Sequence, residues 1–212
     1  MIEKYNKYFV IGFNKTATTT IHNLFEVNNL KSQHTDKEWD LENFTCFSDN
    51  GNQRNYPELY STYPNSIFIL NVRKLNEWLL SRFKHGYNIC KEKPINWAYP
   101  PTIDLCIEWI QSREEHHLNV LNFFKDKKNK LIIISIDNYN WLDYLALKLK
   151  LKIYNIKSQN IINTSGKHRF LIDIIDKCFQ KLNYSSSEKK SLLLKNKTLE
   201  NELVNLYYNN IY

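Results

Sequence analysis

The sequence predicts an α/β protein in which helices cover both faces of a central parallel sheet, a three-layer α/β/α fold. Apolar strands alternate with amphipathic helices along the chain, and the nearly all-apolar run 66–72 is typical of a strand covered on both faces. The chain has 212 residues, 42% of them hydrophobic, with only four Gly and five Pro. This length and composition predict one packed domain, residues 1–212.

Short apolar runs bounded by turn residues predict the strands, and apolar residues at helical spacing predict the helices. The expected strands are 8–11, 30–34, 44–47, 66–72, 131–136 and a short last one at 152–156. The expected helices are 18–29, one or two turns at 56–63, 75–84, 102–124, 139–149, 170–182 and a final segment after a capping box of Ser185 and Glu188. Thr102 is expected to cap its helix, and the proline-containing segment 86–101 to be irregular.

The first strand ends in a tight loop that carries a cation and a row of hydroxyls. The loop reads Gly12-Phe-Asn-Lys15, and the helix that follows opens on threonines. A strand that turns sharply into a helix directs unpaired backbone N–H groups and the positive end of the helix dipole at one point. That point favours a phosphate or a similar oxyanion, and Lys15 adds a full positive charge. The sequence therefore predicts an anion-binding loop.

Other polar side chains follow the next expected strands. His34 ends the second strand and precedes Asp36 and Glu38, Asp49 follows the third, and Arg73 ends the fourth. Because the carboxyl ends of parallel strands meet at one edge of a sheet, where such folds bind ligands, these side chains should converge with the anion-binding loop.

Charge and cysteine content limit the possible partners. The net charge of +7 suits a polyanion such as a nucleotide, a nucleic acid or an acidic polymer, and a solvated lysine-rich surface is equally compatible with it. The four cysteines follow no metal or disulfide spacing, so we expect reduced thiols and no metal site. The sequence shows no signal peptide and no apolar run near the ~18 residues of a membrane span, so we expect a cytoplasmic protein.

Two motifs together resemble one family. The loop is no Walker A motif, because Lys15 follows Gly12 by three positions and no Gly precedes it directly. Gly12-Phe-Asn-Lys-Thr-Ala-Thr-Thr-Thr-Ile21 instead resembles the 5′-phosphosulfate loop of sulfotransferases that use 3′-phosphoadenosine 5′-phosphosulfate (PAPS), G-x-x-[KR]-[ST]-G-T-[TS]-[SW]-L or similar. Arg73, with Ser81 eight residues later in the next helix, is similar to the family's 3′-phosphate element. The resemblance covers residues 8–150 and implies a P-loop NTPase-like sulfotransferase architecture.

The resemblance implies roles for individual residues. The 5′-phosphosulfate would be held by Asn14, Lys15, Thr16, Ala17, Thr18, Thr19 and Thr20. Lys15 would also stabilise the negative charge that grows on the bridging oxygen, and Arg73 and Ser81 would bind the 3′-phosphate. Lys167 lies in the nearest equivalent of the family's C-terminal loop over that phosphate. Ala17 stands where the family usually has Gly, and a loop position with positive φ would penalise Ala by ~1 kcal/mol or more.

The residue that acts as the base and activates the acceptor is less certain than the donor-binding residues. His34 is the first candidate, because a neutral imidazole accepts a proton near pH 7, and Asp36 or Glu38 could replace or orient it. An ordinary polar loop residue is the alternative for His34. Asp49, Tyr87 and Trp97 are candidate acceptor-binding residues, and packing against the core is the alternative for the two aromatic side chains.

The sequence thus predicts a metal-independent enzyme that transfers a sulfuryl group from PAPS to a hydroxyl, or secondarily an amine, and releases 3′-phosphoadenosine 5′-phosphate (PAP). A P-loop kinase of a nucleoside or small molecule would account for the loop but not for Arg73 with Ser81. A non-enzymatic, basic nucleic-acid-binding domain would account for the charge but not for the loop. The sequence leaves the acceptor open among carbohydrates, lipids, small alcohols and protein tyrosine, and it does not determine the oligomeric state.

Overall fold

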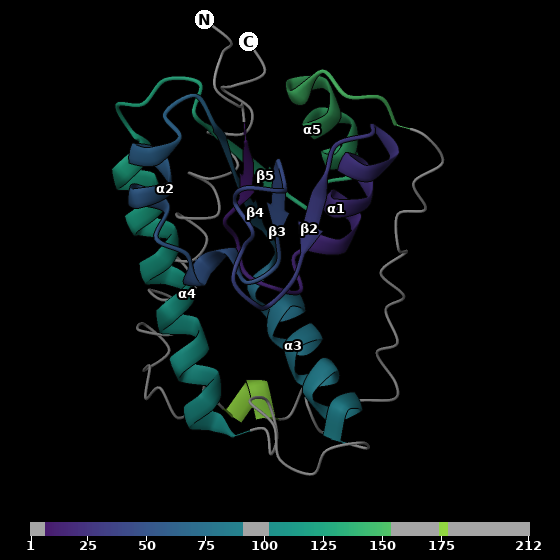
Figure 1. Ribbon diagram of the computed structural model, residues 1–212. Helices are drawn as coiled ribbons and strands as arrows, with labels where there is room; N and C mark the ends of the chain where they lie inside the picture. The colour runs from purple at the N-terminus through teal and green to yellow at the C-terminus, as the bar shows by residue number, and fades with distance from the viewer. Residues whose placement is uncertain (1–6, 91–101, 154–173, 178–212) are drawn as a thin grey trace, which may run out of the picture. The chain divides into compact units, whose positions relative to one another are not determined.

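The computed structural model describes residues 7–90, 102–153 and 174–177 (Figure 1). These residues fall into two compact units. The first contains 7–73 and 117–153, and the second contains 74–90, 102–116 and 174–177. That the whole chain forms one domain stays a prediction.

The first unit contains a five-stranded sheet in which all neighbouring strands are parallel, as predicted. The strands are β1 (Tyr8–Val10), β2 (Ser32–His34), β3 (Cys46–Ser48), β4 (Ile67–Val72) and β5 (Leu131–Ser135). Four of them lie inside the predicted ranges, and β3 reaches one residue further, to Ser48. The strand expected at 152–156 is absent at Lys152 and Ile153, and the rest of that range lies outside the described residues.

The helices largely follow the predicted ranges. They are α1 (Thr18–Val27), α2 (Tyr56–Thr62), α3 (Leu75–Cys90), α4 (Ile103–Phe124) and α5 (Trp141–Leu149), with a short 3-10 turn at Gly51–Gln53. Thr102 caps α4 as predicted, because its hydroxyl accepts a hydrogen bond from the Leu105 N–H at 3.1 Å.

The expectation of irregular structure from residue 86 onward was wrong for 86–90. Helix α3 continues past Lys84 to Cys90, because the prolines that suggested a break come later, the first of them at Pro94. Residues 91–101 lie outside the described part of the chain, as do Ser185 and Glu188. Residues 174–177 are helical, within the helix expected at 170–182.

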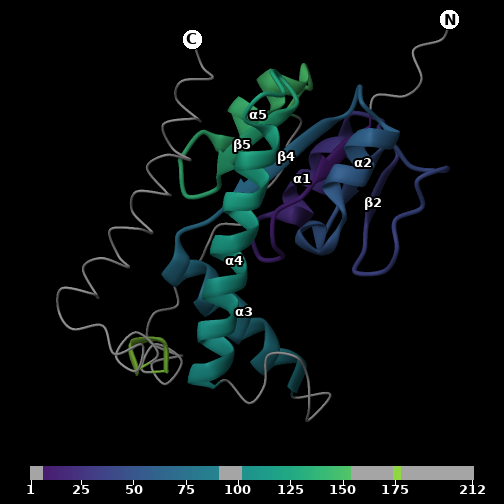
Figure 2. The ribbon, with the colours of Figure 1, turned by 90° about the vertical axis from the view of Figure 1, so that its left-hand side faces the viewer.

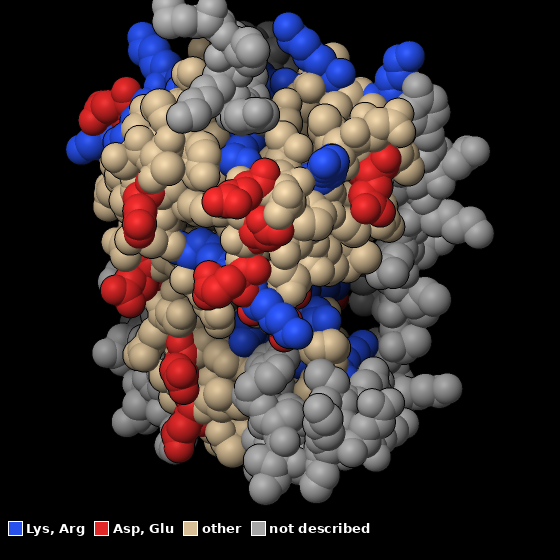
Figure 3. Space-filling model, viewed as in Figure 1, with Lys and Arg blue, Asp and Glu red and all other residues tan. Residues whose placement is uncertain are grey.

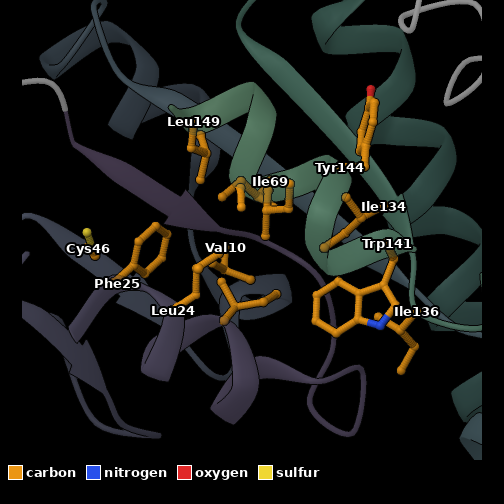
Figure 4. Close-up of a cluster of buried hydrophobic side chains, with 13 residues drawn as sticks. Val10, Leu24, Phe25, Cys46, Ile69, Ile134, Ile136, Trp141, Tyr144 and Leu149 are labelled. Atoms are coloured by element: carbon orange, nitrogen blue, oxygen red, sulfur yellow. The ribbon is translucent and has the colours of Figure 1, made fainter. Parts of the chain in front are cut away.

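Helices α1 and α5 cover one face of the sheet, and a cluster of buried apolar side chains fills the space beneath them (Figure 4). The cluster consists of Val10, Ile21, Leu24, Phe25, Cys46, Ile69, Ile134, Ile136, Trp141, Tyr144, Leu145, Ala146 and Leu149. The same apolar positions that give α1 its helical periodicity, among them Ile21 and Leu24, therefore fix it over the sheet.

Aromatic rings fill the other face. Side chains alternate along β1, so Phe9 points away from Val10, and its ring centroid lies 5.3 Å from that of Phe47 and 5.2 Å from that of Phe68. Phe124, at the end of α4, lies 5.0 Å from Phe68. Helix α2 and the last turns of α4 thus form the third layer of this unit, on the side away from α1 and α5 (Figures 1 and 2).

The strand order is β2-β3-β1-β4-β5. From β1 the chain proceeds through α1 to one side of the sheet, whereas from β4 it proceeds to β5 on the other side. In parallel sheets, ligands bind in the crevice at the carboxyl ends of two neighbouring strands whose connections diverge in this way. Here those strands are β1 and β4, which carry the anion-binding loop and Arg73.

Charged side chains of both signs are interspersed over the described residues on the face seen in Figure 3. The excess of positive charge is therefore not gathered into one block on that face. Among the described residues, no helix combines the length and the apolar character that crossing a membrane requires.

Candidate anion-binding site at the carboxyl edge of the sheet

The backbone between β1 and α1 alternates in handedness. Lys15 has a φ of 64° and Ala17 a φ of 65°, whereas Thr16 between them has a negative φ. Alternation of this kind turns successive backbone N–H groups toward one side and forms a concavity that binds anions. Each non-glycine residue in the left-handed region costs about 1 kcal/mol, so the loop holds a strained conformation.

Helix α1 opens directly on this loop. Ala17 is its N-cap and supplies no side-chain hydrogen bond, and its first turn contains no acidic residue. The first helical bond runs from the Ile21 N–H to the Ala17 carbonyl at 3.1 Å, so the N–H groups of Thr18, Thr19 and Thr20 precede the intrahelical ladder. An anion at the loop would therefore meet the positive end of the helix dipole.

Asn71 in β4 clamps both ends of the loop. Its side-chain oxygen accepts a hydrogen bond from the Gly12 N–H at 3.1 Å, and its Nδ2 donates to the Thr16 carbonyl at 2.8 Å and to the Thr16 hydroxyl oxygen at 2.5 Å. Asn71 is fully buried, so these bonds form without competition from water. One amide therefore fixes residues 12 and 16 relative to β4 and holds the strained segment between them.

Two consequences follow from the clamp. A Cβ on Gly12 would lie 2.2 Å from the Asn71 side-chain oxygen, so the close approach requires glycine at this position. The buried Thr16 hydroxyl donates its proton to the Phe13 carbonyl and accepts from Asn71. The Thr16 side chain therefore shapes the loop, and its hydroxyl proton is not directed at a ligand.

Arg73 follows β4 and meets the same loop. It is buried, and its Nη1 donates to the Lys15 carbonyl at 3.3 Å. The buried Arg73 side chain therefore meets the backbone of the half-buried Lys15 at the crevice between β1 and β4. The convergence of these two residues is confirmed.

The loop after β3 closes the edge beside them. The Asn52 N–H donates to the Gly12 carbonyl at 3.2 Å, and a Cβ on Gly51 would lie 1.9 Å from the Val10 carbonyl oxygen. Asp49, with a φ of 73°, precedes this contact. The close approach of Gly51 to β1 brings the Asp49 segment to the site.

His34 lies at the carboxyl end of β2 and joins the site through α1 and β3. Its Nδ1 lies 2.9 Å from the Ser48 hydroxyl oxygen, and its Nε2 lies 3.3 Å from the Thr19 hydroxyl oxygen. Its ring stacks on that of His22, with centroids 5.4 Å apart and planes 24° apart. The side chain is thus held on three sides, with Nε2 turned toward the start of α1.

Burial and the charges nearby both act on the pKa of His34. Burial lowers the pKa of His34 below its ordinary value, Asp49 acts in the opposite direction, and His22 and Lys15 lower it further. Lys15 and Asp49 therefore both act electrostatically on His34, as the convergence of strand ends predicted. A neutral imidazole at neutral pH is a proton acceptor.

The other candidate bases lie differently. Asp36 is exposed, and it is not among the charged groups that shift the pKa of His34. The Glu38 carboxylate forms an ion pair with Arg54 at 3.0 Å, and its side chain is 95% exposed. Asp49 is thus the carboxylate that acts on His34.

Some of the remaining predicted site residues lie within the part of the chain that the structure describes, and others lie outside it. Asn14 is half-buried in the loop, and Thr18 and Thr20 are buried at the start of α1. Ser81 lies half-buried in α3, which belongs to the second unit, whereas Arg73 belongs to the first. Tyr87 is in the last turns of α3, and its side chain is outside the described residues, as are Trp97 and Lys167.

Sequence reasoning missed three residues that the structure brings to the site: Asn71, Ser48 and His22. Asn71 is the one polar residue of β4, and a buried polar residue at the end of an apolar strand was the available signal. His22 lies three positions after Thr19, on the same helix face, and this spacing was the available signal. Ser48 carried no signal, because its strand was expected to end at residue 47.

No protein-family model matches this chain, and no curated protein is significantly similar to it. Among the described residues, no group of three or more His, Cys, Asp or Glu side chains is arranged to hold a metal ion. The functional interpretation therefore depends on the loop, its two cations and the His34 cluster.

Proposed function

We propose that this chain is a sulfotransferase that moves a sulfuryl group from PAPS to a hydroxyl acceptor. The observation that carries the proposal is the strained loop between β1 and α1. Its alternating backbone and the uncapped start of α1 favour an anion, and the loop adds the cation Lys15, whose backbone carbonyl accepts a hydrogen bond from the second cation, Arg73. A donor with phosphates at both its 5′ and 3′ ends suits two separate cations better than a single phosphate does.

Transfer of this kind breaks the bond between sulfur and the bridging oxygen and forms a bond between sulfur and the acceptor oxygen. The electron pair of the broken bond stays on the 5′-phosphate of PAP, where Lys15 and the backbone N–H groups of the loop would stabilise the growing charge. The acceptor proton would pass to His34 Nε2. The Thr19 hydroxyl, 3.3 Å from that nitrogen, lies on the same side of the ring.

The kinase alternative is disfavoured by the groups around Thr16. In P-loop kinases the hydroxyl of the loop Ser or Thr binds Mg²⁺ through its lone pairs. Here the Asn71 amide donates to the Thr16 hydroxyl oxygen and to the Thr16 carbonyl, and this penultimate residue of β4 is an amide where a carboxylate would attract a cation. The arrangement suits a reaction that proceeds without Mg²⁺.

Calorimetry with PAP and 5′-AMP, both without Mg²⁺, tests the proposal. PAP should bind at least about tenfold more tightly than 5′-AMP, because the 3′-phosphate adds a charge-assisted contact. Arg73→Ala should remove most of that difference while leaving 5′-AMP binding nearly unchanged.

Tight binding of ATP with Mg²⁺, together with no affinity for PAP, would favour a kinase. Salt-sensitive binding to nucleic acid with no affinity for PAP would favour a nucleic-acid-binding domain. Either result would reject the sulfotransferase. When PAP binds as expected, transfer from labelled PAPS into extracts of the source cell identifies the class of acceptor.

A further inference from the structure

We propose that His22 is a positioning residue that holds the His34 imidazole in the orientation and the neutral charge state of a base. The proposal rests on the proposed function for the role of His34. The contact between the two histidines can be measured without any substrate, so the two claims can fail separately.

One face of α1 is organised around the two imidazoles. Thr19, His22 and Glu26 follow one another at spacings of three and four residues, which places them on one side of the helix. The Thr19 hydroxyl oxygen lies 3.3 Å from His34 Nε2, the His22 ring stacks on the His34 ring, and Glu26 pairs with His22. Helix α1 therefore contacts the His34 ring twice, through Thr19 at its edge and through His22 on its face.

His22 is itself held at both ring nitrogens. Its Nδ1 lies 2.8 Å from the Ser32 hydroxyl oxygen, and its Nε2 lies 3.5 Å from a Glu26 carboxylate oxygen. Ser32 and His34 are two residues apart on β2, so their side chains leave the strand on the same face. The His22 ring is thus fixed against the same strand face from which His34 projects.

The stack also opposes protonation of His34. His22 acts to lower the pKa of His34, and the centroids of the two stacked rings lie 5.4 Å apart. The groups that face His34 are Thr19 and His22 from α1, Ser48 from β3, Asp49 after β3 and Lys15 after β1. Of these, Asp49 alone favours the charged imidazole.

The test follows the ring nitrogens of His34 by ¹⁵N NMR during a pH titration of the whole protein without ligand. In His22→Phe the stacked ring stays aromatic but can carry no charge, so the proton affinity of His34 should rise about threefold or more. His116→Phe is the matched control, because His116 is not among the charged groups that act on His34.

His22→Asn serves as the second variant, because the amide can still hydrogen-bond the Ser32 hydroxyl if Phe disturbs the packing. Unchanged titration of His34 in both folded His22 variants would overturn the inference, whatever PAP does. If the wild type binds no PAP but the proton affinity of His34 rises as expected in the His22 variants, the proposed function fails and the pairing of His22 with His34 stands. If transfer is observed, the acid limb of its pH profile should move to higher pH in His22→Phe, with PAP affinity unchanged.

Discussion

Two lysines flank β1, and their surroundings differ in burial, in backbone conformation and in the groups that lie near them. Lys7, before the strand, is buried, and its Nζ donates to the carbonyls of Leu41 and Phe44 at 2.7 and 2.8 Å. The same ammonium lies within 5.5 Å of the ring centroids of Phe47 and Tyr63. Burial lowers the pKa of Lys7, which is the expected cost of placing an ammonium in the core.

Lys15, after the strand, is half-buried in a left-handed conformation, beside Arg73 and within electrostatic reach of His34. The comparison shows that one residue type, at two positions eight residues apart, bonds to backbone carbonyls at one end of a strand and lies in a strained loop at the other.

Separate substitutions of the two lysines should give the largest effects. Lys15→Ala should reduce sulfuryl transfer by about 100-fold or more, because the charge that offsets the leaving phosphate is lost. The free energy of unfolding should change little.

Lys7→Met should lower the free energy of unfolding by about 2 kcal/mol, because two carbonyls lose their donor, with PAP affinity retained. Activity assays and urea denaturation of both variants measure the contrast, and a Lys15 variant with full activity would refute it.

The Asn71 clamp should matter for both fold and site. Asn71→Ala removes three hydrogen bonds of a buried amide and should lower the free energy of unfolding by about 2 to 3 kcal/mol. PAP affinity should fall with it, because the loop loses its fixed shape. Asn138→Ala is the matched control, since the buried side-chain nitrogen of Asn138 has no hydrogen-bond partner, and it should cost less than about 1 kcal/mol. Equal losses in the two variants would contradict the clamp.

The pH dependence of both activity and stability follows from His34. Because the folded protein lowers the pKa of His34 below 6.5, the unfolded chain binds this proton more tightly than the folded one does. The contribution of His34 to stability is therefore complete above about pH 6.5 and is lost as the pH falls through the folded-state pKa.

Transfer should show its acid limb in that same range below pH 6.5. Asp49→Asn should move the limb to lower pH, because it removes the charge that favours the imidazolium. Denaturation and rate measurements between about pH 7.5 and about pH 5 check the two directions. Normal turnover by His34→Ala would remove His34 as the base.

The smallest expected effect concerns backbone strain in the loop. Ala17→Gly should raise the free energy of unfolding by about 0.5 to 1 kcal/mol, because Gly adopts a φ of 65° without the Cβ penalty and is the better N-cap. Ala146→Gly, the same change inside α5, should lower it by about 1 kcal/mol. Thermal unfolding of the two variants reports the difference in sign, and a destabilised Ala17→Gly protein would contradict the strained loop.

Most of the fold could be predicted because its elements depend on local patterns. The apolar runs at β4 and β5 and the helical spacing of Ile21, Leu24 and Phe25 require no knowledge of tertiary contacts. The positive φ at Ala17 was anticipated in the same way, from the resemblance of the loop to a glycine-containing pattern. The extent of α3 was not predicted, because the prolines from Pro94 onward indicated an irregular segment that begins at residue 86, whereas the helix continues to Cys90.

The site was predicted only as far as the ends of strands indicate it. Parallel strands bring Lys15, His34 and Arg73 to one edge, and the order of strands is enough to expect that. The hydrogen bonds of Asn71 and the stack of His22 on His34 depend on how side chains meet across β4 and α1. Such contacts join residues about 60 positions apart or lie on a helix face whose orientation the sequence alone does not determine.

The most direct test of the central claim is to map PAP onto the backbone amides by NMR. The proposal predicts that saturating PAP shifts the amides of Gly12, Ala17, Thr18 and Arg73, at the carboxyl edge of the sheet. The amides beside Lys7 at the opposite edge, such as that of Cys46, should remain unchanged. No shifts at saturation, or shifts confined to the edge that contains Lys7, would contradict the assignment of this loop as the donor site.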